Sequence, residues 1–340
     1  MYKNILCSAL LTVTFLISSS PIQGASAICF PNQTQFCVDP RFADFWQRND
    51  RHAITGETGN ALRVFGYPIG AARIQAVDGE AVLAQPFENV MMQQPLDNTD
   101  PIRVTLQQVG LERLDQLGAP PTLPVQPSES ARSGCRLFPE TGFTICGEFL
   151  NFWESNGLNL DNERGYSDPE RIALFGRPVS RVTSDNKLRV QWFERARMQY
   201  DAIASKISIT PLGYEVTIHR PNPSPLPQNN GVQVSNTTVN AGGIISARGS
   251  GYNEDRSARV VVFRADGSKF TAEDIVEINS ISITEKYCLK IPSDALTGIW
   301  GIAFEGTTTN RRTIGFFRVV TNSTPNNTCP DLITPLPTSR

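Results

Sequence analysis

Aromatic residues recur at helical spacing near the start of the chain and again about 110 residues later. Positions i, i+3 and i+4 of the two stripes are filled by Phe42, Phe45 and Trp46, and by Phe149, Phe152 and Trp153. Residues at this spacing share one face of an α-helix. Asp39 and Pro40 supply the cap and first position that helix starts favour, and Gly157 is placed to end the second helix. We expect both stripes to pack into a core; the alternative is a ligand groove.

An alternation of apolar and polar residues lies further along the chain. Its apolar positions are Leu188, Val190 and Trp192, and then Met198 and Tyr200. Such a period of two predicts a β-hairpin, and Glu194-Arg195 is placed at its turn. The corresponding earlier segment is less regular, because Pro86 stands where the later one has Trp192.

Three sequence landmarks occur twice in the same order. They are Cys37 and Cys146 before the aromatic stripes, Phe-Gly-x-Pro at 65–68 and 175–178, and Gln-x-Phe-Glu at 85–88 and 191–194. Their offsets are 109, 110 and 106 residues, so the copies run nearly in step. Glycine with proline two residues later predicts a tight turn. Repetition of this kind indicates a duplicated unit. We predict two homologous small α+β modules, residues 28–118 and 131–220.

The second and third landmarks resemble the LGFP-type repeat of bacterial cell-surface and secreted proteins. They resemble more closely modules of exported bacterial proteins that pair a Cys-aromatic helix with sequences such as FGYP and WFER. The resemblance covers residues 29–118 and 135–213, and it implies an extracellular module that mediates cell-wall association rather than catalysis. Two features depart from the repeat: Arg177 replaces an aromatic or aliphatic residue before proline, and no glycine pair follows Glu88 or Glu194.

The pattern changes after two proline-rich linkers, 119–130 and 221–230. Short β-rich runs with turn signals then follow at 231–234, 244–248, 258–264, 281–283, 287–291, 300–305 and 313–320. Seven short strands in about 90 residues predict an immunoglobulin-like β-sandwich over 231–329, with a tail at 330–340. The segment 241–252 resembles the start of immunoglobulin-like domains in bacterial exported proteins. The expected fold class is therefore multidomain, with two α+β modules followed by an all-β domain.

Residues 1–27 have the features of a secretory signal peptide. Lys3 precedes an apolar stretch at 5–17, and Ala25-Ser26-Ala27 matches the pattern that signal peptidase accepts. A transmembrane anchor is the alternative, but the apolar stretch is short for a bilayer. We expect a secreted or cell-surface protein with no membrane insertion after the signal is removed.

Cysteine spacing supports export independently. Beyond the signal, the cysteines are Cys29, Cys37, Cys135, Cys146, Cys288 and Cys329. Six cysteines allow fifteen pairings, but their distribution favours Cys29–Cys37, Cys135–Cys146 and Cys288–Cys329. The alternative is a zinc site, which usually shows shorter spacings, and an oxidising compartment favours disulfides.

Charge and candidate chemistry narrow the function classes. The formal net charge is −2, and no basic cluster with interleaved aromatics occurs, so nucleic acid is not an expected partner. The two histidines, His52 and His219, lie in different modules, and no zinc-hydrolase, α/β-hydrolase or P-loop motif occurs. We therefore predict no catalytic residue, no cofactor and no metal. An acidic stretch could instead bind calcium, although a solvated loop is the favoured interpretation; its members are Asp161, Glu163, Asp168 and Glu170.

The resulting hypothesis is an exported, non-catalytic protein that binds cell-wall polymer, glycan or another surface protein through its paired modules. The candidate binding residues are Phe87, Glu88, Trp192, Phe193 and Glu194. One alternative is a secreted glycosidase-like hydrolase that uses Glu88 and Glu194 at a site between the modules. The other is a structural spacer of the cell surface.

Overall fold

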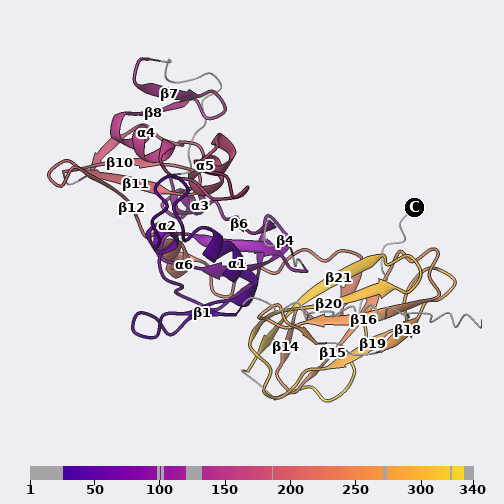
Figure 1. Cartoon of the computed structure of the whole chain (residues 1–340). Helices are drawn as coiled ribbons and strands as arrows, with labels where there is room; N and C mark the ends of the chain where they lie inside the picture. The colour runs from indigo at the N-terminus through magenta and orange to yellow at the C-terminus, as the bar shows by residue number, and fades with distance from the viewer. Residues whose placement is uncertain are drawn as a thin grey trace, which may run out of the picture.

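The computed structural model describes residues 26–97, 100, 103–119, 132–185, 187–270, 274–321 and 324–332. Nearly all of the expected signal peptide, most of the first proline-rich linker and the end of the tail lie outside the described residues. The described chain is rich in β-structure, with several separate sheets and short helices (Figure 1). None of its helices is long and apolar enough to cross a membrane.

The chain before residue 220 consists of two halves with the same order of elements. The first half contains β1 (Ile28–Cys29), β2 (Cys37–Val38), α1 (Pro40–Arg48), α2 (Asn60–Phe65), β3 (Arg73–Val77), β4 (Glu80–Pro86), β5 (Met91–Pro95), β6 (Thr105–Leu106) and α3 (Val109–Gln116). The second contains β7 (Cys135–Phe138), β8 (Phe143–Cys146), α4 (Gly147–Glu154), α5 (Asp168–Phe175), β9 (Thr183–Asp185), β10 (Leu188–Trp192), β11 (Arg197–Asp201), β12 (Lys206–Ile209) and α6 (Leu212–His219). Each half thus has a two-stranded hairpin, two helices, a four-stranded meander and a final helix.

The aromatic stripes lie on α1 and α4, as their spacing predicts. Asp39 caps α1, since its Oδ1 accepts a hydrogen bond from the Arg41 amide at 3.0 Å. The rings of α1 are buried, and so are Phe149 and Trp153 of α4. The expectation that Gly157 ends the second helix is wrong: α4 ends at Glu154 with Ser155 as its C-cap. Gly157 instead lies against Tyr166, whose ring would be 2.8 Å from an added Cβ.

The Phe-Gly-x-Pro turns follow two short helices, α2 and α5, that the pattern did not predict. Gly66 and Gly176 cap these helices with φ angles of 77° and 75°, in the region that glycine tolerates best. An added Cβ at either glycine would lie within 2.6 Å of a glutamate side chain, Glu88 or Glu194. The third landmark therefore packs directly on the second in both halves.

The two halves share one hydrophobic core instead of burying separate ones. Its fully buried aromatic members come from both halves and are Phe42, Phe45, Phe65, Phe87, Phe149, Trp153, Phe175 and Phe193. The last helix of each half also contacts the hairpin turn of the other half. The Gly110 amide of α3 donates to the Glu194 carbonyl at 3.0 Å, and the Tyr214 amide of α6 donates to the Glu88 carbonyl at 2.9 Å. The contact is reciprocal, as in a symmetric dimer.

The described residues beyond 231 form two sheets. Their strands are β13 (Val232–Val234), β14 (Thr238–Asn240), β15 (Ile244–Gly249), β16 (Ser257–Phe263), β17 (Lys269–Phe270), β18 (Ile275–Glu277), β19 (Tyr287–Lys290), β20 (Gly298–Gly306) and β21 (Arg312–Val320). One sheet has the order β13-β15-β19; the other has the order β14-β21-β20-β16-β17, with β18 also paired to β16. Side chains from both sheets form a second core that includes Tyr252, Trp300, Phe304 and Phe317.

The prediction of a strand at 281–283 is wrong. Asn279 Oδ1 accepts hydrogen bonds from the amides of Ile281 and Ile283, both at 3.1 Å, and Ser282 has a φ of 63°. This local capping forms a turn, a competing conformation that short polar side chains favour. The neighbouring strand is β18.

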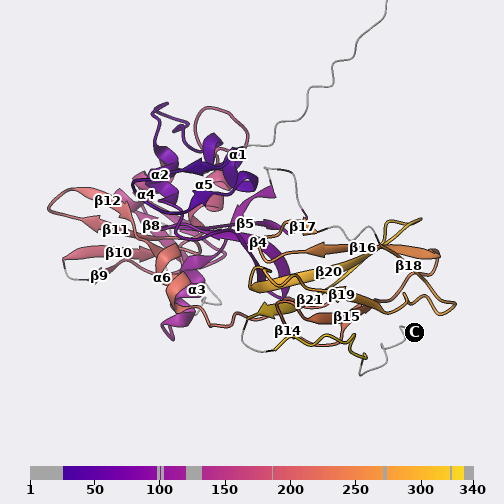
Figure 2. The same ribbon diagram turned by 90° about the horizontal axis from the view of Figure 1, so that it is seen from below.

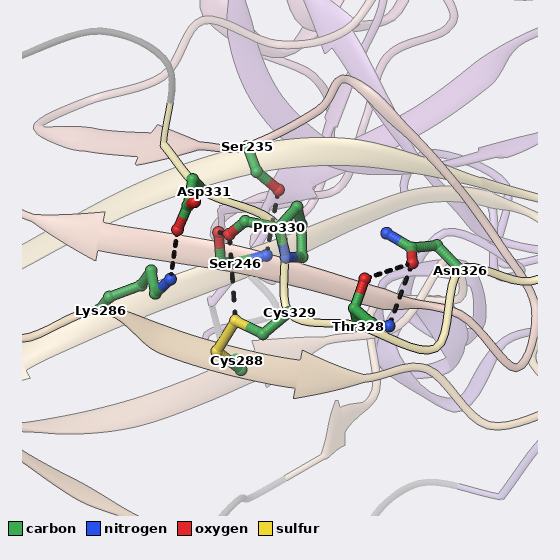
Figure 3. The surroundings of a disulfide bond; sticks show 9 residues. All are labelled: Ser235, Ser246, Lys286, Cys288, Asn326, Thr328, Cys329, Pro330 and Asp331. Atoms are coloured by element: carbon green, nitrogen blue, oxygen red, sulfur yellow. Dashed lines mark hydrogen bonds and ion pairs between the residues drawn. A yellow bond between two sulfur atoms is a disulfide. The ribbon is translucent and has the colours of Figure 1, made fainter.

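Three disulfides join the pairs that the spacing predicts. Cys29–Cys37 and Cys135–Cys146 each link directly paired residues of a two-stranded hairpin. Cys288–Cys329 ties the segment after β21 to β19. Figure 3 shows that the same segment is also held by Pro330, whose carbonyl accepts from Ser246 Oγ at 2.7 Å. Disulfides fit an oxidising compartment.

The β-domain lies beside the first half of the chain (Figures 1 and 2). Ile74 of β3 joins a small apolar cluster with Phe263 and Ile299, and its amide donates to the Ala265 carbonyl at 2.9 Å. Asp97 forms ion pairs with Lys269, at 2.5 Å, and with Arg312. The junction therefore combines apolar contact with charge pairing.

Candidate functional site

The apolar residues of the sequence-predicted binding set are mainly core residues. Phe87 and Phe193 are fully buried, so their rings present no surface to a ligand. Trp192 is partly buried, and the Arg197 guanidinium lies 4.9 Å from its ring centroid.

The two repeated glutamates bind backbone amides of their own halves. Glu88 Oε2 accepts from the Tyr67 amide at 2.9 Å, and Glu194 Oε2 accepts from the Arg177 amide at 2.9 Å. Arg195 also lies 3.6 Å from Glu194. Each carboxylate thus fastens the turn after Gly66 or Gly176, which is a structural role for the repeated Phe-Glu sequence.

The acidic stretch is largely engaged by protein groups. Asp168 pairs with Arg136 and, at 2.8 Å, with Arg171; the Arg136 hydrogen bond outweighs partial burial and lowers the Asp168 pKa. Glu170 is buried and accepts from the Ser167 and Leu160 amides, both at 2.8 Å. Among the described residues, no group of three or more His, Cys, Asp or Glu side chains is arranged to hold a metal ion.

A cavity of about 870 Å³ lies where both halves and the β-domain meet. One wall is the sheet of the first half together with the start of α3, and the second half contributes Arg195. The linker from Arg220 to Pro225 and the β-domain residues 297–299 and Arg318 complete it. We call this the junction cavity. None of its residues belongs to the candidate binding set predicted from sequence.

Arg220 organises one side of the junction cavity. Its guanidinium donates to both carboxylate oxygens of Glu112, at 2.7 and 2.6 Å. It also donates to Gln75 Oε1 and Gln107 Oε1, each at 2.6 Å. Bidentate pairing of this kind fixes geometry as well as charge. Arg220 therefore holds the Gln107 side chain by its oxygen and leaves its amide nitrogen unused.

Two buried side-chain atoms of the lining residues have no hydrogen-bond partner among the described residues. They are Gln107 Nε2, a donor, and Gln93 Oε1, an acceptor, and both atoms are buried. Gln93 pairs with Thr105 across β5 and β6, so Gln107 is its diagonal neighbour on the same face of the sheet. Buried polar groups almost always have a partner, so each unpaired atom calls for an explanation.

Arginines outnumber carboxylates in the lining. The arginines are Arg73, Arg195, Arg220 and Arg318, and the carboxylates are Asp78, Glu112 and Asp115. Glu112 compensates Arg220. Within the described chain, Arg318 donates to the Ser224 carbonyl and forms no ion pair, and burial lowers its pKa. Arg73 donates to the Ala72 carbonyl at 3.0 Å. Arg195 lies 3.6 Å from Glu194, and Asp78 and Asp115 also line the cavity, so the charges of the lining nearly balance.

This cavity could not be predicted from the sequence. Its residues come from β3, β5, β6, α3, the second half, the second linker and the β-domain, which only the tertiary structure brings together. The position of Gln93 is occupied in the second half by Gln199, which does not line the cavity. The repeat pattern therefore carries no signal for it.

No protein-family model matches the sequence, and no curated protein matches it. Among solved structures, the chain is similar to a Salmonella alpha-2-macroglobulin mutant, Y1175G, with 10% sequence identity and a TM-score of 0.22. The match covers 75% of this chain and 13% of that one. A likeness this weak carries no argument about function.

Proposed function

We propose that this chain is an exported, non-catalytic binding protein that attaches to cell-wall polymer, a glycan or another surface protein. The observation that carries the proposal is the junction cavity, whose volume of about 870 Å³ and mixed apolar and polar lining suit a small ligand or one unit of a polymer. The disulfides support an extracellular location, because such bonds persist in oxidising compartments.

The proposal also assigns each segment of the chain to a class of domain. Residues 28–118 and 131–220 are taken as homologous modules of the LGFP-type class, supported by their common element order. Residues 231–329 are taken as an immunoglobulin-like sandwich, supported by two sheets around one core. In this view, binding is a property of the assembled modules and not of the exposed surface of either one.

Incubation of the purified chain with cell-wall sacculi and a glycan panel tests the proposal. We expect the protein to sediment with the sacculi or to be retained by a glycan without releasing soluble fragments. If soluble fragments are released, and this release is lost in Glu88→Gln or Glu194→Gln, the chain is a hydrolase and not a non-catalytic binding protein. Neither retention nor release would leave the chain as a structural spacer and refute the proposal.

A further inference from the structure

We infer that a second pocket of the chain binds an uncharged sugar unit through its hydroxyl groups. The pocket has a volume of about 420 Å³ and lies between the start of β4, the end of the second proline-rich linker and β21. We call it the linker pocket; it shares no lining residue with the junction cavity. The inference rests on the proposed binding function and names a further place on the chain where a glycan would be held.

Three consecutive carboxamide side chains line the linker pocket, those of Gln228, Asn229 and Asn230. All three residues are exposed, and the backbone that carries them is fixed. The Gln228 amide donates to the Gly79 carbonyl at 2.8 Å, and Asn230 and Ile314 exchange two backbone hydrogen bonds of 2.8 Å. The pocket therefore keeps one backbone arrangement before a ligand arrives.

The three carboxamides have hydrogen-bonding groups that the protein leaves unused. Within the described chain, the side chains of Gln228 and Asn230 form no hydrogen bond. Asn229 Oδ1 accepts from the Phe316 amide at 2.8 Å, which leaves the Asn229 side-chain nitrogen to donate. A carboxamide offers donors and an acceptor side by side, and a hydroxyl group both donates and accepts. Neighbouring hydroxyls of a sugar ring can therefore pair with these accessible atoms.

The charged groups of the linker pocket are mostly paired with one another. Arg312 forms ion pairs with Asp97 and Glu305, and Asp97 also pairs with Lys269 at 2.5 Å. Glu80 is exposed and forms no ion pair within the described residues, and one exposed carboxylate attracts or repels a ligand only weakly. Hydrogen bonding, and not charge, therefore selects the ligand, which favours an uncharged molecule.

Part of the pocket wall is apolar. Ala81, Leu96 and Ile314 are half-buried lining residues, packed against a cluster that includes the buried rings of Phe263 and Phe316. A sugar ring carries hydroxyls at its rim and C–H groups on its faces, so it can contact this wall while its rim reaches the carboxamides. An apolar wall with a few fixed polar groups is typical of small-ligand sites.

Isothermal titration of the full chain with four tetrasaccharides tests the inference. Cellotetraose and maltotetraose are uncharged and differ in linkage, whereas tetragalacturonic acid is anionic and the tetramer of glucosamine is cationic. We expect one uncharged probe to bind more tightly than both charged probes. Its affinity should change less than about twofold between about 0.1 and about 1 M salt, where the Debye length falls from about 10 to about 3 Å. Equal binding of all four probes, binding of none, or strong salt dependence would overturn the inference.

The double variant Gln228→Ala/Asn230→Ala removes two of the three carboxamides. At two lost hydrogen bonds, we expect a loss of affinity for the uncharged probe of about tenfold or more. The matched control is Gln47→Ala/Asn236→Ala, which removes two exposed carboxamides outside the lining and should bind like the parent. Unchanged affinity in the folded Gln228→Ala/Asn230→Ala variant would overturn the assignment.

Asn229→Asp is the second test, should the double variant not fold. The substitution keeps the oxygen that accepts from the Phe316 amide and removes the side-chain N–H donors. We expect the affinity for the uncharged probe to fall about fivefold, the equivalent of one hydrogen bond. Unchanged affinity would show that the carboxamides do not hold the sugar.

Sedimentation with cell-wall sacculi separates this inference from the function on which it rests. If the parent and Gln228→Ala/Asn230→Ala sediment equally, the binding function stands and the linker pocket is not its site. If sedimentation falls in this variant but not in Gln47→Ala/Asn236→Ala, both are supported. If the parent neither sediments nor binds any probe, both fail.

Discussion

Gly110 lies against the backbone carbonyl of Phe193, so closely that an added Cβ would be 1.9 Å from the carbonyl oxygen. Gly213 repeats the relationship in the opposite direction, with 2.1 Å to the Phe87 carbonyl oxygen. Each glycine belongs to the last helix of one half and touches the hairpin turn of the other. The two halves are therefore packed against each other through two equivalent close contacts.

The variant Gly110→Ala tests this contact between the halves. Because the facing atom belongs to the backbone and cannot rotate away, we expect a loss of about 3 kcal/mol in the free energy of unfolding. Gly213→Ala should cost a similar amount. Urea denaturation of each variant measures the loss.

The matched controls are Asp115→Ala in α3 and Ile218→Ala in α6, since both side chains are exposed. We expect each to change the free energy of unfolding by less than about 0.5 kcal/mol. Equal effects of the glycine variants and the controls would show that the contact between the halves is dispensable.

Gln85 and Gln191 occupy equivalent, fully buried positions with unequal hydrogen bonding. Gln85 accepts from the Asp39 amide at 2.9 Å and donates to the Cys37 and Gly70 carbonyls at 2.8 and 3.0 Å. Gln191 donates to two carbonyls, and its Oε1 has no partner in the part of the chain that the structure describes. At about 1 kcal/mol for each bond, Gln85→Leu should cost about 3 kcal/mol and Gln191→Leu clearly less. Equal losses in parallel denaturation curves would contradict this account.

The disulfide between Cys288 and Cys329 closes a loop over 41 residues of sequence separation, compared with 8 for Cys29–Cys37. Loop entropy predicts a contribution of about 4 kcal/mol for the long loop and about 2.5 kcal/mol for the short one. Replacing each pair by serines should therefore destabilise the β-domain more than the first hairpin. Calorimetry of the two double variants would show the order, and a reversed order would refute the loop-entropy argument.

The sequence allowed prediction of the features that depend on neighbouring residues. The rings of α1, the Asp39 cap and the β10–β11 hairpin follow from local spacing, and two of the disulfides join nearby cysteines. The helix α2 was missed because its six residues are too few to show a period, and its N-cap, Gly59, makes no side-chain hydrogen bond.

Features that depend on distant residues were beyond prediction. Gly110 reads as an ordinary helix residue until Phe193, 83 positions later, is placed against it. The junction cavity likewise requires Gln93, Arg220 and Arg318 to converge from three parts of the chain. The residue pattern within one segment does not predict contacts with residues of a distant segment.

Stability should fall in mild acid because of His52. Burial first, and then the positive charge of Arg63, lower the His52 pKa below its ordinary value of about 6.5. His52 lies where the halves meet: its ring is 5.4 Å from that of Tyr166, and Arg63 donates to Asn156 Oδ1 at 2.5 Å. Because the folded state binds the proton less readily than the unfolded state, stability is complete above pH 6.5 and declines as the pH falls through the lower, folded-state value.

Free energies of unfolding measured from pH 7.5 to 5 check this dependence. His52→Gln should flatten the curve in that range, whereas His219→Gln, on an exposed residue of α6, should keep the decline. Glu57 opposes the effect, since its negative charge raises the His52 pKa, so Glu57→Gln should steepen it. Asp97 and Asp168 also have lowered pKa values, but aspartates lose their contribution only near and below pH 4. A decline that persists unchanged in His52→Gln would therefore place the acid sensitivity elsewhere.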